Sequence, residues 1–145
     1  VWSAACSRGQ EVYSLAMYLE KNYYEAHGLP YEIYGTDIDG ESVAYAKNGV
    51  YPLKEVNSIP REYLNTNWKK GTGDVSDYAA VHSKLREKVR FESLNLLDVS
   101  AWRPELQFDV IFCRNVFIYF AQDRVEKIAI DLKSKLSERG LFVSG

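Results

Sequence analysis

The sequence is poor in the residues that mark metal sites, and it has no long apolar run. Its 145 residues include two cysteines and two histidines, and neither pair has the spacing of a metal-binding motif. Cys6 and Cys113 each lie inside an apolar run, which favours buried, inert thiols; a redox or cofactor-lining role is the alternative. We therefore expect no metal ion in the functional site.

Apolar runs of 18 or more residues are missing, and the N-terminus has no charged segment followed by an apolar one. The sequence therefore predicts neither a membrane span nor a secretory signal. An excess of charge of one sign is missing too, because Lys and Arg number 18 against 20 Asp and Glu. This balance gives no reason to expect nucleic acid as the main partner. We expect a cytosolic protein, a monomer, that neither inserts into membranes nor binds nucleic acid.

Length and apolar content favour a single domain. With 46% hydrophobic residues, 145 residues suffice for one substantial core and are few for two. The chain starts and ends inside apolar runs, at Val1 and at Gly145. We therefore expect residues 1–145 to form one domain that is truncated at both ends.

Apolar runs that close on turn residues alternate with stretches of helical periodicity. Strands are expected at residues 1–6, 31–36, 89–94, 108–113 and 141–143. Helices are expected from about residue 10, at 43–47 and at 125–136, with Gly140 ending the last one. Such alternation implies crossover connections, so the sequence predicts an α/β fold with a doubly wound, mostly parallel sheet. A ligand of such a sheet lies at the carboxyl ends of the strands.

Acidic residues follow the first two expected strands. The first turn, residues 7–11, is not the three-glycine motif of dinucleotide-binding folds, which removes the main support for NAD. Glu11 suits the ammonium group of a methionine moiety, and an ordinary turn with a dipole-friendly acid is the alternative. Asp37 suits the two hydroxyls of a ribose. Alternatively Asp37 or Asp39 caps the next helix, and Asp39 lies nearer to it.

Polar and aromatic residues follow the next two strands. Asn95 suits an adenine edge and Leu96 the adenine ring, although Asn95 is also a common turn residue. Residues 114–120 place a cation and an amide at the end of an apolar strand, and aromatic residues follow where a surface loop would be polar. The alternative is that Tyr119 and Phe120 are core residues that anchor the last helix.

Together, four motifs resemble the CheR family of receptor methyltransferases, in the same order and over nearly the whole chain: Ala4-Ala5-Cys6-Ser7-x-Gly9-x-Glu11, Thr36–Asp39, Asn95–Leu97 and Phe112–Phe120. The resemblance implies a Rossmann-like class I methyltransferase domain with S-adenosyl-L-methionine as its cofactor. It also implies a small β-subdomain insertion, expected at residues 69–90, and the cytoplasmic domains of methyl-accepting chemotaxis receptors as partners.

The resemblance implies a position beside the transferred methyl group for Tyr119, and cofactor contacts for Glu11, Asp37, Asn95, Leu96, Arg114 and Asn115. Arg114 is also a catalytic candidate, since it would orient the acceptor carboxylate; a contact with the cofactor's own carboxylate is the alternative. The implied reaction methylates receptor glutamates and so sets receptor adaptation. A glutamate carboxylate is already ionised at neutral pH and needs no strong base, which agrees with the lack of a histidine near any motif.

Two other functions stay open: a methyltransferase of another substrate, and a non-catalytic module that senses S-adenosylmethionine or docks a receptor. Tyr119 and Arg114 favour catalysis, because a sensor does not need them at the methyl end. The segment 69–90 is a candidate docking face for an acidic receptor surface, because its lysines and arginines outnumber its acids. Alternatively these charges only protect an exposed edge strand.

Overall fold

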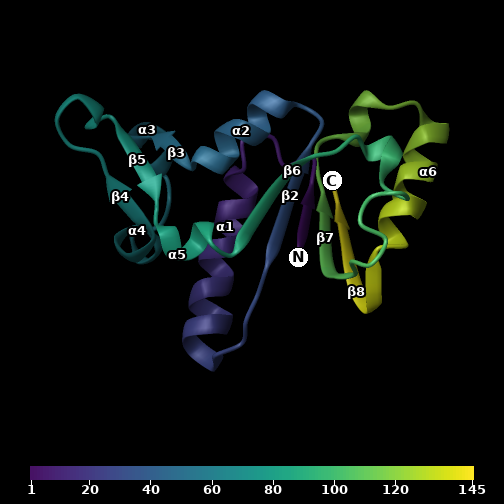
Figure 1. Ribbon diagram of the computed structural model, residues 1–145, viewed down its shortest axis with the longest axis horizontal. Helices are drawn as coiled ribbons and strands as arrows, with labels where there is room; N and C mark the ends of the chain where they lie inside the picture. Colours follow the sequence, from purple (N-terminus) through teal and green to yellow (C-terminus); the bar gives the residue numbers. More distant parts are fainter.

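The computed structural model describes all residues, 1–145. A five-stranded parallel sheet forms its centre, with the strand order β6-β2-β1-β7-β8 (Figure 1). The strands are β1 (Trp2–Ala4), β2 (Ile33–Asp37), β6 (Val89–Ser93), β7 (Phe108–Cys113) and β8 (Leu136–Ser144). The order runs outward from β1 in both directions, so the predicted doubly wound sheet is confirmed, and its direction reverses between β1 and β7.

Helices cover both faces of the main sheet. Figure 1 shows α1 (Gln10–Leu19) and α2 (Gly40–Asn48) on one side and α6 (Gln122–Lys133) on the other. Strand alternation divides β1 between two cores: Trp2 and Ala4 pack on the α6 side, whereas Ser3 points toward α1. α1 continues as a π-helical segment, η1 (Glu20–Glu25). No helix combines the length and the apolar character needed to cross a membrane.

A second, antiparallel sheet with the order β3-β5-β4 is inserted between α2 and β6. Its strands are β3 (Val50–Pro52), β4 (Trp68–Lys70) and β5 (Tyr78–Val81), and the short helices α3 (Leu53–Val56), α4 (Arg61–Asn67) and η2 (Gly73–Val75) connect them. The insertion was predicted, but its limits, residues 69–90, were wrong. Strands of three or four residues carry almost no periodic signal. The segment after β5 does not belong to the small sheet either, because His82 caps the short helix α5 (Ser83–Arg86) and Val89 already pairs with β2 of the main sheet.

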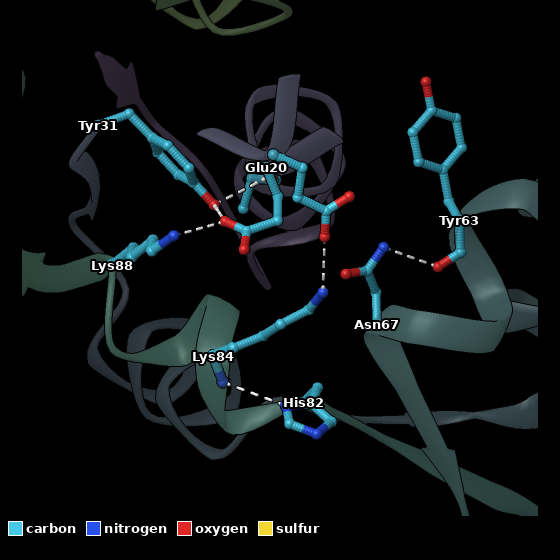
Figure 2. A network of polar contacts seen from close by, with 9 residues as sticks. Glu20, Tyr31, Tyr63, Asn67, His82, Lys84 and Lys88 are labelled. Atoms are coloured by element: carbon cyan, nitrogen blue, oxygen red, sulfur yellow. Dashed lines mark hydrogen bonds and ion pairs between the residues drawn. The ribbon is translucent and has the colours of Figure 1, made fainter. Parts of the chain in front are cut away.

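The buried Glu20 of η1 forms hydrogen bonds with Tyr31 and with Lys88, the residue that precedes β6 (Figure 2). Glu20 is buried, and its Oε2 accepts hydrogen bonds from the Tyr31 hydroxyl at 2.8 Å and from Lys88 Nζ at 2.6 Å. Burial, and after it the bond to Glu20, raises the pKa of Tyr31.

Other cations of the segment 69–90 are paired as well: Lys84 pairs with Glu25 and Arg90 with Glu32. Glutamates outside 69–90 thus neutralise much of the positive charge that made this segment a candidate docking face.

The last helix is shorter than predicted. α6 ends at Lys133, and Leu136 and Gly140 belong to β8, so the predicted helix end at 136 and the stop at Gly140 were wrong. Lys135 explains the early end, because its buried side chain donates to the carbonyl of Trp102 at 2.6 Å and anchors the turn there. A Cβ on Gly140 would lie 3.0 Å from the carbonyl oxygen of Phe108, so glycine permits the close approach of β8 to β7.

Packing of α1 against the sheet depends on the missing side chain of Gly35, in the middle of β2. A Cβ there would lie 2.7 Å from ring atoms of Phe91 and 2.9 Å from Cγ2 of Val12. We predict that Gly35→Ala lowers the free energy of unfolding by about 1–3 kcal/mol through overpacking. Gly40→Ala, at the start of α2, is the control, because a Cβ there would lie 3.9 Å from the nearest atom, Oγ of Ser93. This variant should be neutral or slightly stabilising. Equal unfolding curves for both variants in denaturant would contradict this packing.

Candidate functional site

A cavity of about 400 Å³ lies at the carboxyl ends of the main-sheet strands. The loops after β1, β2, β6 and β7 line it, which is where a doubly wound sheet binds its ligand. Its volume lies within the range of about 300–1,000 Å³ found for small-molecule sites. It brings together six of the seven residues predicted from the sequence: Asp37, Asn95, Leu96, Arg114, Asn115 and Tyr119. The seventh, Glu11, does not line the cavity but contacts Arg114.

Strand order arranges these residues in a row. Asn95 and Leu96 come shortly after β6, Asp37 is the last residue of β2, and Arg114 follows β7, with the loop after β1 between the last two. Because neighbouring parallel strands lie about 4.8 Å apart, the row extends across several strand spacings. The cavity therefore has an amide and a leucine at one end, a carboxylate in the middle and a cation at the other end.

Asp37 holds the loop between β1 and α1 in a strained conformation. Ala5, Ser7 and Gly9 all have left-handed φ angles, of 61°, 50° and 84°. The Ser7 amide donates to Oδ2 of Asp37 at 2.7 Å, and the Asp39 amide donates to Oδ1 at 3.0 Å. Each carboxylate oxygen keeps a further lone pair, so Asp37 can still accept two hydrogen bonds from a ligand.

Asp39 is the cap of α2, and the alternative in which Asp37 caps this helix is wrong. The carboxylate of Asp39 accepts from the amides of Glu41 and Ser42, at 3.3 and 3.1 Å, and from the Ser42 hydroxyl at 2.6 Å. The hydrogen bonds from Ser42 lower the pKa of Asp39. The two aspartates, two positions apart, thus have separate functions: one stabilises the helix start and the other faces the cavity.

Glu11 and Arg114 meet where the strand order reverses. Glu11 lies in the first turn of α1, where the helix dipole favours a negative charge. Its Oε2 accepts from Nη1 of Arg114 at 3.3 Å, and its Oε1 accepts from the hydroxyl of Ser3 at 2.8 Å. Because the Arg114 side chain is 54% exposed, its guanidinium group is free to make further hydrogen bonds on the cavity side.

Asn95 serves as a turn residue and a cavity residue at once. Its side-chain oxygen accepts from the amide of Leu97 at 3.0 Å and caps the short helix η3 (Leu96–Asp98). Its side-chain NH₂ makes no hydrogen bond within the chain, so two donors remain for a ligand. Leu96 is buried beside it and offers an apolar wall.

Tyr119 lies at the mouth of the cavity rather than in the core. It belongs to the short helix η4 (Phe117–Tyr119) and is 79% exposed, so the alternative of a core anchor is wrong for this residue. Phe120 is half-buried and does pack against the core on the α6 side. Asn115 has a left-handed φ of 56°, and its amide donates to the carbonyl of Gly145 at 3.3 Å, which fixes the loop after β7 to the end of β8.

The two cysteines are free and buried, as predicted, and their inertness follows from that burial. Burial, and after it the charge of Asp37, raises the pKa of the Cys6 thiol to about 12. Burial, and after it the charge of Glu11, raises the pKa of the Cys113 thiol to about 12 as well. Neither forms a nucleophilic thiolate at neutral pH.

Sequence reasoning missed two serines and an isoleucine at this site. Ser7 contributes its backbone amide and Ser3 its hydroxyl, whereas Ile38 lines the cavity although it is 69% exposed. Ser3 had a usable signal, since it is the one polar residue in an otherwise apolar run. An isoleucine between two aspartates was a signal as well.

All of residues 1–145 match the family model described as CheR methyltransferase, SAM binding domain. The chain is 36% identical over 148 residues to Chemotaxis protein methyltransferase 2 of Pseudomonas aeruginosa. It is 37% identical over 145 residues to the chemotaxis protein methyltransferases of Salmonella typhimurium and Escherichia coli. Each match covers 100% of this chain and 50–51% of the relative, so the chain spans about half the length of these curated relatives.

Solved structures support the same fold. PKMT2 from Rickettsia typhi in complex with AdoHcy superimposes with a TM-score of 0.60 at 18% identity, over 99% of this chain and 20% of that one. The DhpI–SAH complex gives a TM-score of 0.55 at 19% identity, over 99% of this chain and 48% of that one. The predicted class, a Rossmann-like methyltransferase fold with a small antiparallel sheet, is confirmed.

Because both thiols are buried, they should react slowly with thiol reagents in the native protein. At pH 8 in the native protein, we expect Cys6 and Cys113 to resist a thiol-alkylating reagent that labels both fully in denaturant, because almost no thiolate forms when the pKa is about 12. Peptide mass spectrometry locates the label. Rapid native labelling of Cys6 would show that the loop before α1 opens, against the tight arrangement around Asp37.

Proposed function

The chain belongs to the CheR methyltransferase family, and from this premise we propose that it binds S-adenosyl-L-methionine in the cavity of about 400 Å³ and methylates glutamate side chains of chemotaxis receptors. The acceptors would be the cytoplasmic domains of methyl-accepting receptors, so the reaction would take place in the cytoplasm. The small sheet between Val50 and Val81 would be the family's β-subdomain.

The order of groups along the cavity carries the proposal. Adenine, ribose and methionine follow one another in the cofactor, and the strand order offers suitable partners in the same sequence. The free NH₂ of Asn95 would donate to the adenine edge while Leu96 packs on the ring. Asp37 would accept from both ribose hydroxyls with its remaining lone pairs. The methionine end would then reach Arg114, with Asn115 beside it.

The charges of Arg114 and Glu11 favour particular partners for the carboxylate and the ammonium group of the methionine moiety. The Arg114 guanidinium would bind the cofactor's carboxylate, for which its planar set of donors is suited. An unpaired cation close to a sulfonium would cost electrostatic energy, and the ion pair with Glu11 at 3.3 Å offsets that cost. Glu11 would also attract the cofactor's ammonium group. We therefore favour a cofactor contact for Arg114 over orientation of the acceptor.

The chemical step needs no general base. A carboxylate oxygen of the acceptor glutamate attacks the methyl carbon, the bond between that carbon and sulfur breaks, and its electron pair stays on sulfur. The products are a glutamate methyl ester and S-adenosylhomocysteine. Opposite charges neutralise one another in this step, so alignment and exclusion of water favour it.

Tyr119 would act on the acceptor side. Tyr119 lines the cavity and is 79% exposed, its chain neighbour Ile118 is 76% exposed, and a docked receptor would cover both. A module that only senses the cofactor would not need a tyrosine there. The names of the curated relatives, chemotaxis protein methyltransferases, favour a receptor over another acceptor.

Cofactor binding is tested by comparing the two neighbouring aspartates. We predict that Asp37→Ala weakens S-adenosylhomocysteine binding by about tenfold or more, because hydrogen bonds to a charged group are worth roughly 1.5–3 kcal/mol. Asp39→Ala should lower the melting temperature, since it removes the cap of α2, but should leave the affinity nearly unchanged. Titration calorimetry on the full-length protein measures both. Equal losses of affinity would remove Asp37 from the binding site.

Catalysis is tested with S-adenosylmethionine carrying a labelled methyl group and a receptor cytoplasmic fragment. The full-length protein should produce a protein-bound label that mild base releases as methanol, as expected for a methyl ester. Tyr119→Phe should lower the turnover with S-adenosylhomocysteine affinity nearly unchanged, because the hydroxyl acts at the methyl end. No base-labile label on the receptor fragment, with cofactor binding intact, would instead favour a sensing or docking module.

A further inference from the structure

Ser3 is a buried polar residue beneath the candidate site. It lies in the middle of β1, between Gly35 of β2 and Phe112 of β7, and it is 0% exposed. A buried hydroxyl costs free energy unless it is hydrogen-bonded. The hydroxyl of Ser3 donates to Oε1 of Glu11 at 2.8 Å, so its single proton goes to a residue next to the cavity.

Glu11 connects Ser3 to the cavity. One carboxylate oxygen accepts from Ser3, and the other accepts from Nη1 of Arg114. The three residues come from β1, from the first turn of α1 and from the end of β7, so the chain of hydrogen bonds crosses the point where the strand order reverses. Of the three, only Arg114 lines the cavity.

We propose that Ser3 is a positioning residue of the cofactor site, which acts on the cofactor only through Glu11 and Arg114. By holding Oε1, Ser3 fixes the side-chain torsions of Glu11 and directs Oε2 toward Arg114. Arg114 is then held at the end of the cavity that takes the amino-acid part of the cofactor. This inference rests on the proposed function, since it assumes that S-adenosylmethionine binds here.

A different role for Ser3 would have different consequences. If its hydroxyl only stabilised the sheet, its removal would disturb the whole cavity, including the adenine and ribose contacts at Asn95 and Asp37. If it acts through Glu11, only ligands with an amino-acid part respond to its removal. In addition, the hydroxyl then has no effect once Glu11 is gone.

The test is a double-mutant cycle on the full-length protein, with calorimetric affinities for two ligands. S-adenosylhomocysteine has the amino-acid part, and 5′-methylthioadenosine lacks it. Ser3→Ala should weaken S-adenosylhomocysteine about three- to tenfold, less than the loss of a direct charged contact, and leave methylthioadenosine within about twofold. In a Glu11→Ala background, Ser3→Ala should change neither affinity. Ser14→Ala is the matched control, because it removes a hydroxyl of α1 that bonds only the Gln10 carbonyl.

Additive losses for Ser3→Ala and Glu11→Ala, or equal losses for both ligands, would overturn the proposal. Thermal unfolding identifies a variant that is not folded at the assay temperature. If Ser3→Ala is such a variant, Ser3→Cys takes its place, because a thiol has nearly the same shape and is a weak donor. Failure of the unmodified protein to bind either ligand would contradict the proposed function itself and is thereby distinguished from a failure of this inference.

Discussion

Asp37 accepts a hydrogen bond from the backbone amide of Ser7, and this contact joins the carboxyl ends of β2 and β1. Left-handed backbone at non-glycine residues costs about 1–3 kcal/mol per residue, and the loop contains two of them, Ala5 and Ser7. The carboxylate compensates part of that cost and determines where α1 begins. The start of α1 in turn places Glu11, and Glu11 contacts Arg114. Three of the seven candidate residues, Asp37, Glu11 and Arg114, are therefore linked to one charged hydrogen bond that also leaves Asp37 open to a ligand.

The parallel sheet then determines the order in which the functional groups follow one another along the cavity. The ends of β6, β2 and β7 supply the amide, the carboxylate and the cation at the same edge, and the strand order β6-β2-β1-β7 turns residues far apart in the sequence into a row. A row of amide, carboxylate and cation fits a long ligand with an aromatic base, a diol and a zwitterionic end better than a compact one. The same sheet supplies support from below through Ser3, a buried hydroxyl that bonds the first turn of α1.

The main sheet and most of the site could be predicted, because strong apolar runs end directly in polar residues. Phe108–Cys113 has the predicted limits, and Arg114 follows it as expected. The small sheet was mislocated, because three-residue strands such as Val50–Pro52 have no period to detect. The end of α6 was missed because Leu136 fits the helical spacing, whereas tertiary contacts of Lys135 end the helix earlier. Ser3 was not predicted as a site residue, since its bond to Glu11 depends on how α1 packs over β1.

A crystal structure of the full-length protein with S-adenosylhomocysteine would show whether strand order sets the orientation of the ligand. We expect adenine at Asn95 and Leu96, the ribose hydroxyls on Asp37 and the homocysteine carboxylate at Arg114. A ligand bound in the reverse direction, or in another cavity such as the one of about 490 Å³ lined by Tyr13 and Arg86, would contradict this orientation.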